Sequence, residues 1–271
     1  MTHTPTAQPR VPPGAATPPA ASVAGGFPGK LRVLDLFSGV GGFSLGLERT
    51  GGFETVAFCE IEPFARGILS KHWPGVPQYD DVRTLTASGL VEAGIWPDVI
   101  VGGFPCQDIS LAGKGAGLGG DQSGLWREFI RLIREIGPSL VIVENVSALL
   151  RRGLGDILRD LAEAGLDAEW DCLPASFVGA PHNRDRIWII AYPQRDEQPR
   201  QEPCFGALGR VGRIEQPVPW ETHWEAALSA IRGMDDGLSR SVDRTDLMRN
   251  AVVPQLVTEI GRAILQARAA A

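Results

Sequence analysis

The sequence predicts an α/β fold whose centre is a doubly wound, mainly parallel sheet. Short apolar segments that suit strands alternate with helical segments from residue 31 onward. A glycine-rich turn stands where the first predicted strand meets the first predicted helix. The 271 residues are 44% hydrophobic and 21% charged, which suits one globular unit with a small second lobe.

Two strand–helix units open the predicted sheet. An apolar run predicts a strand over Leu31–Phe37, and the turn Ser38–Gly42 leads into a helix over Phe43–Arg49. A second strand is expected over Glu54–Cys59, followed by a helix over Glu62–His72.

The middle of the chain adds a third clear strand and a long helix. The strand covers Asp98–Val101, and a glycine-rich loop follows over Gly113–Gly124. Apolar residues at helical spacing then predict a helix that Gly137 and Pro138 end: Leu125, Phe129, Ile133 and Ile136.

The last predicted strands follow in the same manner. A strand over Leu140–Val143 ends at Glu144, and a helix is expected over Leu154–Ala164. Two further strands cover Ala168–Leu173 and Ile187–Tyr192. Alternation of strands with helices favours crossover connections, and hence parallel pairing.

Composition divides the chain into four segments. Residues 1–29 form a Pro/Ala-rich tail that we expect to be disordered, and residues 30–192 form the core. Residues 193–246 are rich in Pro, Gly, Arg and Gln and predict a small irregular insert. Residues 247–271 contain an amphipathic helix that returns to the core, with apolar Val253, Leu256, Val257, Ile260 and Ile264.

Charge and cysteine usage narrow the possible sites. The net charge is −6, so a nucleic-acid partner would need a local cluster of cations rather than a basic protein. We expect about half of the candidate cations to be ordinary surface charges: Lys114, Arg127, Arg131, Arg134, Arg184, Arg186, Arg210, Arg213, Arg240, Arg244 and Arg249. The four cysteines show no C-x-x-C spacing, so neither a metal site nor a disulfide framework is predicted, and a cytosolic location fits. No apolar run reaches membrane-spanning length.

The turn D-L-F-S-G-V-G-G, over Asp35–Gly42, suits close approach of a ligand to the backbone. Ser44 replaces the third glycine of the dinucleotide fingerprint, which favours a ligand without a pyrophosphate. Glu60 is placed to accept hydrogen bonds from ribose hydroxyls, and Asp81 from an adenine amino group. An adenosine without phosphates points to S-adenosylmethionine.

A single cysteine, Cys106, follows the third strand in V-G-G-F-P-C-Q. A cysteine on a tight turn at a strand end suits a nucleophile, whereas a cysteine taken alone is more often buried core.

Together these segments resemble the DNA cytosine-5 methyltransferases. The resemblance covers residues 31–192 and continues from Asn250, with five short motifs in the family's order. They are D-L-F-S-G-V-G-G at 35–42, G-G-F-P-C-Q at 102–107, E-N-V at 144–146, R-D-R at 184–186 and N-A-V-V-P at 250–254.

The resemblance implies a role for each motif. Cys106 would add to C6 of a cytosine rotated out of double-stranded DNA, and Glu144 would be the acid near N3 of that ring. Arg186 would contact the base carbonyl and orient the acid, with Arg184 in support. The implied cofactor-binding residues are Asp35, Phe37, Ser38, Gly39, Gly41, Gly42, Glu60, Ile61, Asp81, Val82, Pro105 and Asn250.

The resemblance also implies partners and leaves alternatives open. A monomer in the cytoplasm, associated with the nucleoid, would act on DNA without a metal, beside a cognate restriction endonuclease. Residues 193–246 would be a short target-recognition region. Transfer RNA is an alternative substrate, because one branch of the family methylates it. A catalytically silent relative that binds DNA or cofactor is the other alternative, because Arg249 stands where glycine is usual.

Overall fold

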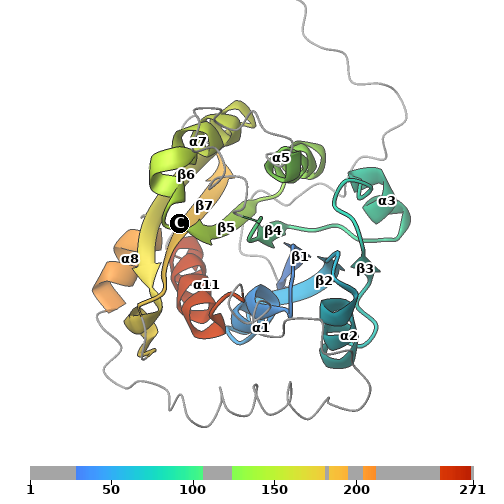
Figure 1. Cartoon of the computed structure of the whole chain (residues 1–271), viewed down its shortest axis with the longest axis horizontal. Helices are drawn as coiled ribbons and strands as arrows, with labels where there is room; N and C mark the ends of the chain where they lie inside the picture. The colour runs from blue at the N-terminus through green and yellow to red at the C-terminus, as the bar shows by residue number, and fades with distance from the viewer. Residues whose placement is uncertain (1–28, 106–123, 181–182, 195–203, 212–250, 270–271) are drawn as a thin grey trace, which may run out of the picture.

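The computed structural model describes residues 29–105, 124–180, 183–194, 204–211 and 251–269. Within them, one seven-stranded sheet has the order β3-β2-β1-β4-β5-β7-β6, with helices on both faces (Figure 1). This confirms the predicted α/β class. The strands are β1 (Leu31–Leu36), β2 (Phe53–Cys59), β3 (Gln78–Tyr79), β4 (Val99–Gly102), β5 (Leu140–Val146), β6 (Leu166–Pro174) and β7 (Asp185–Pro193).

Helices cover the two faces of the sheet. In Figure 1, α1, α2 and α11 lie on one side, and α3, α5 and α7 on the other. Local signals define some helix starts: Pro63 begins α2, and the Thr86 hydroxyl accepts the Gly89 amide at the start of α3. The helices are α1 (Gly42–Glu48), α2 (Pro63–His72), α3 (Ala87–Glu92), α5 (Gly124–Ile136), α6 (Leu149–Arg152), α7 (Leu154–Glu163), α8 (Cys204–Val211) and α11 (Pro254–Ala269), with the 3-10 helix η2 (Ala175–Val178).

Strand β7 runs against its neighbours. It pairs antiparallel with both β5 and β6, whereas the other pairs in the sheet are parallel. The chain passes from β6 to β7 through η2 and a short segment rather than through a crossover helix, so the direction must reverse. β7 therefore inserts between β5 and the edge strand β6.

Alternation along β5 decides which side chains reach which face. Leu140 and Ile142 belong to the core under α1 and α11, while Val141 and Val143 belong to the core under α5 and α7. The strand continues to Val146, beyond the predicted end at Val143. Glu144 is therefore inside the strand, and by alternation it lies on the face of α1 and α11.

Five elements have no counterpart among the predicted ones: β3, α3, α6, η2 and α8. β3 has two residues and α6 four, too few for a periodic pattern. α8 lies within residues 193–246, where an irregular insert is expected, and its Cys204 and Leu208 are buried against the core of α11. In the described part of the chain, no helix is both long and apolar enough to cross a membrane.

Candidate active site

The turn after β1 is shaped by three residues with positive φ. These are Phe37 (φ 53°), Gly39 (φ 52°) and Gly41 (φ 84°). A Cβ at Gly41 would come within 2.6 Å of the Trp73 ring, so this position has neither the conformation nor the space for a side chain. The Ser38 hydroxyl donates to the Asp35 carbonyl at 2.6 Å and closes the turn. The turn is thus closed by a hydrogen bond, and two of its three positive-φ positions are glycine.

The carboxylate of Glu60 fastens this turn to the end of β2. One of its oxygens accepts the Gly39 amide at 2.7 Å, and the other accepts the Glu62 amide at 2.8 Å. Glu60 is 9% exposed, and it lines the cavity described below. The residue predicted to bind ribose hydroxyls therefore also has a structural task in shaping the turn.

Asp35 lies beneath the turn rather than on its surface. It is fully buried, and the Ser44 hydroxyl donates to its Oδ2 at 2.7 Å. Its Oδ1 has no hydrogen-bond partner among the described residues. Burial raises the pKa of Asp35 to about 8, and the bonds from Ser44 only partly offset this. Ser44, which breaks the dinucleotide fingerprint, is thus the partner of a buried acid.

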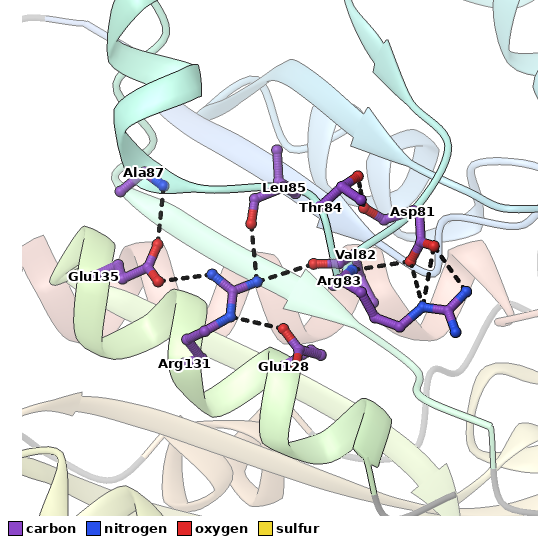
Figure 2. Close-up of polar contacts among 9 residues, drawn as sticks. All are labelled: Asp81, Val82, Arg83, Thr84, Leu85, Ala87, Glu128, Arg131 and Glu135. Carbon is purple, nitrogen blue, oxygen red and sulfur yellow. Dashed lines mark hydrogen bonds and ion pairs between the residues drawn. The ribbon is translucent and has the colours of Figure 1, made fainter.

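The loop after β3 carries Asp81 and Val82. Both carboxylate oxygens of Asp81 accept from the Arg83 guanidinium, with the shortest bond 2.7 Å (Figure 2). These bonds lower the pKa of Asp81. An adenine amino group would therefore share this carboxylate with Arg83.

Glu144 and Arg186 form an ion pair where β5 and β7 adjoin. Arg186 Nε lies 2.9 Å from Glu144 Oε1, and the Glu144 side chain is 8% exposed. Burial raises the pKa of Glu144 to about 7, although Arg186 and Arg184 act in the opposite direction. The carboxyl group is thus poised to hold or release a proton near neutral pH.

Arg184 stands beside this pair. Burial, together with the charge of Arg186, lowers its pKa. Its Nη2 is buried and has no hydrogen-bond partner among the described residues. A buried donor without a partner is costly, so this atom is available to a ligand carbonyl or phosphate.

The segment leading to Cys106 is held against β5. The Asn145 side-chain amide donates to the Phe104 carbonyl at 3.0 Å, and its oxygen accepts the Val146 amide at 2.8 Å. A Cβ at Gly103 would lie 2.9 Å from Glu144 Oε2, so glycine lets this segment approach the acid. Sequence reasoning gave Asn145 and Gly103 no role of their own, although both belong to quoted motifs.

One cavity of about 720 Å³ joins the glycine turn to the Glu144–Arg186 pair. Asp35 and Gly41 are not among its lining residues, and Cys106 and Asn250 lie outside the described residues. The remaining predicted site residues all line it: Phe37, Ser38, Gly39, Gly42, Glu60, Ile61, Asp81, Val82, Pro105, Glu144, Arg184 and Arg186. Glu60, Glu62, Asp80 and Asp81 line one end together with Arg83, which is paired with Asp81, and Glu144 lines the other end with the two arginines.

No cluster of His, Cys, Asp and Glu that could hold a metal ion occurs in the described part of the chain. Arg131, one of the candidate phosphate-binding cations, is engaged inside the protein instead. Its guanidinium donates to two carboxylates and two backbone carbonyls (Figure 2).

The sequence of the chain is similar to those of known proteins. The family model described as C-5 cytosine-specific DNA methylase matches residues 31–224. The Bacillus subtilis type II methyltransferase M2.BsuMI is 36% identical over 172 residues, 59% of this chain and 42% of the relative. The orphan methyltransferase M.SPRI of Bacillus phage SPR is 32% identical over 250 residues, 86% of this chain and 55% of the relative. The chain thus spans about half the length of these relatives, or less.

Solved structures agree with the fold. A mutant of Spodoptera frugiperda DNMT2 superposes with a TM-score of 0.53 at 21% identity, covering 64% of this chain and 53% of that one. The S. pombe Dnmt2 methyltransferase gives a TM-score of 0.51 at 20% identity, covering 62% and 51%. At these identities the structures support the sheet and its helices, and nothing finer.

Proposed function

The chain belongs to the C-5 cytosine-specific DNA methylases, whose family model matches more than half of it, and on this premise we propose that it methylates cytosine in double-stranded DNA. The methyl group would come from S-adenosylmethionine and go to C5 of a cytosine rotated out of the duplex. One observation carries the proposal. The buried Glu144–Arg186 pair shares a cavity with the glycine turn and with Pro105, the residue before Cys106.

Cytosine C5 is a poor nucleophile while the ring is aromatic, so the chain must first disrupt the ring. In the proposed step the Cys106 thiolate forms a bond to C6, and the ring electrons move toward N3, which takes the proton of Glu144. This leaves an enamine at C5. A Glu144 pKa of about 7 suits the step, because the carboxyl group holds its proton in a large share of molecules at neutral pH.

After methyl transfer the addition of the Cys106 thiolate to C6 is reversed by elimination. The C5 proton leaves to a base, the C6–sulfur bond breaks to restore the Cys106 thiolate, and N3 returns its proton to Glu144. The covalent bond is temporary, so the protein emerges unchanged.

The arginines orient and polarise the base. Arg186 holds Glu144 through Nε at 2.9 Å, which leaves its Nη2 for the cytosine carbonyl, since Nη1 donates to the Asp185 carbonyl. The unpartnered Nη2 of Arg184 is a second donor toward the same end of the cavity.

The other end of the cavity fits S-adenosylmethionine. The positive-φ turn exposes glycine backbone to the cavity at Gly39 and Gly42, and Glu60 lies beside it. Ile61 is 65% exposed and lines the cavity, so its side chain is accessible to the ring of a bound ligand. Acidic residues at this end suit a cationic ligand. When bound, the cofactor supplies an electrophilic methyl group to C5.

We extend the proposal to the whole chain. Residues 30–192 and 247–271 would form the catalytic part, and residues 193–246 would contact the target sequence. The protein would act as a monomer without a metal, in the cytoplasm, beside a cognate restriction endonuclease. The family supports action on DNA, and these finer assignments are part of the proposal.

The test is transfer of radiolabelled methyl from S-adenosylmethionine to double-stranded DNA and, in parallel, to transfer RNA. We expect label in DNA with the parent protein, none with Cys106→Ala, and strong loss with Glu144→Gln. DNA containing 5-fluorocytosine should trap a covalent adduct, because the C5 fluorine cannot leave as a proton does. Label in transfer RNA alone would show that RNA, and not DNA, is the substrate. An active Cys106→Ala protein would refute the covalent step.

A further inference from the structure

Arg131 occupies an unusual position on α5. It lies on the helix face turned toward the loop after β3, and it joins that loop to the helix (Figure 2). Its Nη2 donates to the Val82 carbonyl at 3.0 Å and to the Leu85 carbonyl at 2.9 Å. The partners are 46 and 49 residues away in the chain, so the contact is tertiary.

The rest of the guanidinium is fixed from the helix itself. Nε donates to Glu128 Oε2 and Nη1 to Glu135 Oε1, both at 2.7 Å. The second oxygen of Glu135 accepts the Ala87 amide at 3.1 Å, the first residue of α3. Arg131 and Glu135 therefore hold two carbonyls and one amide of the segment 82–87.

This segment begins at the cofactor end of the cavity. Val82 lines the cavity, and its backbone carbonyl is one of the two that Arg131 holds. Asp81, one residue earlier, also lines the cavity, and β3 before it is only two residues long. The loop has turn bonds of its own, from the Thr84 and Leu85 amides to the Asp81 carbonyl, and Arg131 adds an attachment to α5.

We propose that Arg131 is a positioning residue for cofactor recognition. It holds the 81–85 loop in the shape that accepts adenine. The inference rests on the proposed function, because it assumes that an adenosine ligand occupies this end. Arg131 does not touch the ligand. It acts through the backbone of Val82 and Leu85.

A planar guanidinium is needed for this arrangement. It presents donors in several fixed directions, so one group can serve two carboxylates and two carbonyls at once. A lysine ammonium is a single point of charge and cannot span these partners. We therefore expect Arg131→Lys to restore little of what Arg131→Met loses.

The experiment measures binding of S-adenosylhomocysteine, and of its inosine analogue without the amino group, by calorimetry. We expect Arg131→Met to weaken S-adenosylhomocysteine binding about tenfold, because a displaced loop would lose about one hydrogen bond's worth of binding free energy to the ligand. We also expect the preference for adenine over hypoxanthine to shrink. In methyl transfer, KM for S-adenosylmethionine should rise while kcat at saturation changes little.

Arg134→Met is the matched control. Arg134 lies on the same helix, its side chain is 48% exposed, and it faces Glu163 at 3.7 Å. Glu135→Ala provides a second route, because it removes both the support of Arg131 and the bond to Ala87. A variant that combines Arg131→Met with Glu135→Ala should bind S-adenosylhomocysteine no more weakly than the weaker of the two single variants, since the two residues act as one unit.

The outcomes separate this inference from the function beneath it. Parent protein that fails to bind S-adenosylhomocysteine would overturn the proposed cofactor and leave Arg131 without a ligand to position. Parent protein that binds, with an Arg131→Met variant that binds equally well, would overturn the inference alone. Equal weakening toward both ligands would also overturn it, because the loop shape would then not govern adenine recognition. Glu135→Ala supplies the same readout if Arg131→Met does not fold.

Discussion

Replacing Glu144 by glutamine should change how the stability of the protein depends on pH. Burial raises the pKa of Glu144 from an ordinary 4.5 to about 7 in the folded protein. The folded state therefore keeps this proton over a range in which the unfolded chain has lost it. Raising the pH through that range favours the unfolded chain, so the carboxyl group costs stability at neutral pH.

The size of the effect follows from the shift. A rise of this size corresponds to about 3 kcal/mol in the free energy of unfolding, lost between about pH 4.5 and pH 7. Roughly 1.4 kcal/mol of it falls between pH 6 and pH 8. Glutamine keeps an acceptor for Arg186 but has no proton to lose. The free energy of unfolding of Glu144→Gln should therefore fall less steeply with rising pH than that of the parent.

Urea unfolding at pH 6 and pH 8 measures the difference, away from the sequence pI of about 5.3. Between these pH values the parent should lose about 1.4 kcal/mol more than Glu144→Gln, or roughly 3–6 °C in melting temperature. Other titrating groups, Asp35 among them, are present in both proteins and cancel. Glu163→Gln, which removes an exposed carboxylate, controls for the loss of charge.

Parallel curves for parent and Glu144→Gln would refute the reasoning, since they would mean that Glu144 titrates alike in the folded and unfolded chain. The prediction also ties stability to chemistry. Glu144, which lowers the free energy of unfolding at neutral pH, is also the group proposed to protonate cytosine. Glu144→Gln should therefore be more stable at neutral pH and yet transfer little methyl.

Three further changes test individual contacts, two of them in the site and one at α8. Gly103→Ala places a Cβ 2.9 Å from Glu144 Oε2, so methyl transfer should fall at least about tenfold, measured as label in DNA, with cofactor binding retained. Asn145→Ala removes the bond to the Phe104 carbonyl and should lower kcat while costing about 1–2 kcal/mol in urea unfolding; unchanged kcat would show that this bond does not position the Cys106 segment. Glu169→Ala removes the acceptor of the first two amides of α8, so limited proteolysis should cut near α8 sooner than in the parent, and equal cutting would contradict this anchoring role.

The sequence predicts the frame of the site well because its signals are local. The apolar run of β1 and the glycines after it place the turn, and the E-N-V motif places Glu144 close to the end of β5. The strand is longer than its apolar run, since Asn145 and Val146 are polar or half-exposed yet still pair with β7. Hydrophobicity alone cannot mark the end of a strand that carries a buried acid.

Other features depend on contacts between distant segments. The bond from Asn145 to Phe104 spans 41 residues, and those from Arg131 to the loop after β3 span 46 or more. An arginine within a helical pattern looks like a solvent-exposed charge until its partners are known. The six-residue α3 buries only Leu90 among its own residues, so it leaves almost no periodic trace.

The position of α11 has a consequence for how the protein is made. Ala251 and Val252, just before this helix, line the same cavity as the turn at residues 38–42, and a Cβ at Gly42 would lie 2.8 Å from the Val252 carbonyl. Thr258 donates to the Gly46 carbonyl, 212 residues away. A chain still on the ribosome therefore lacks one wall of the pocket until these late residues have emerged. We expect the synthesis of these residues to set the earliest moment at which the pocket can be complete.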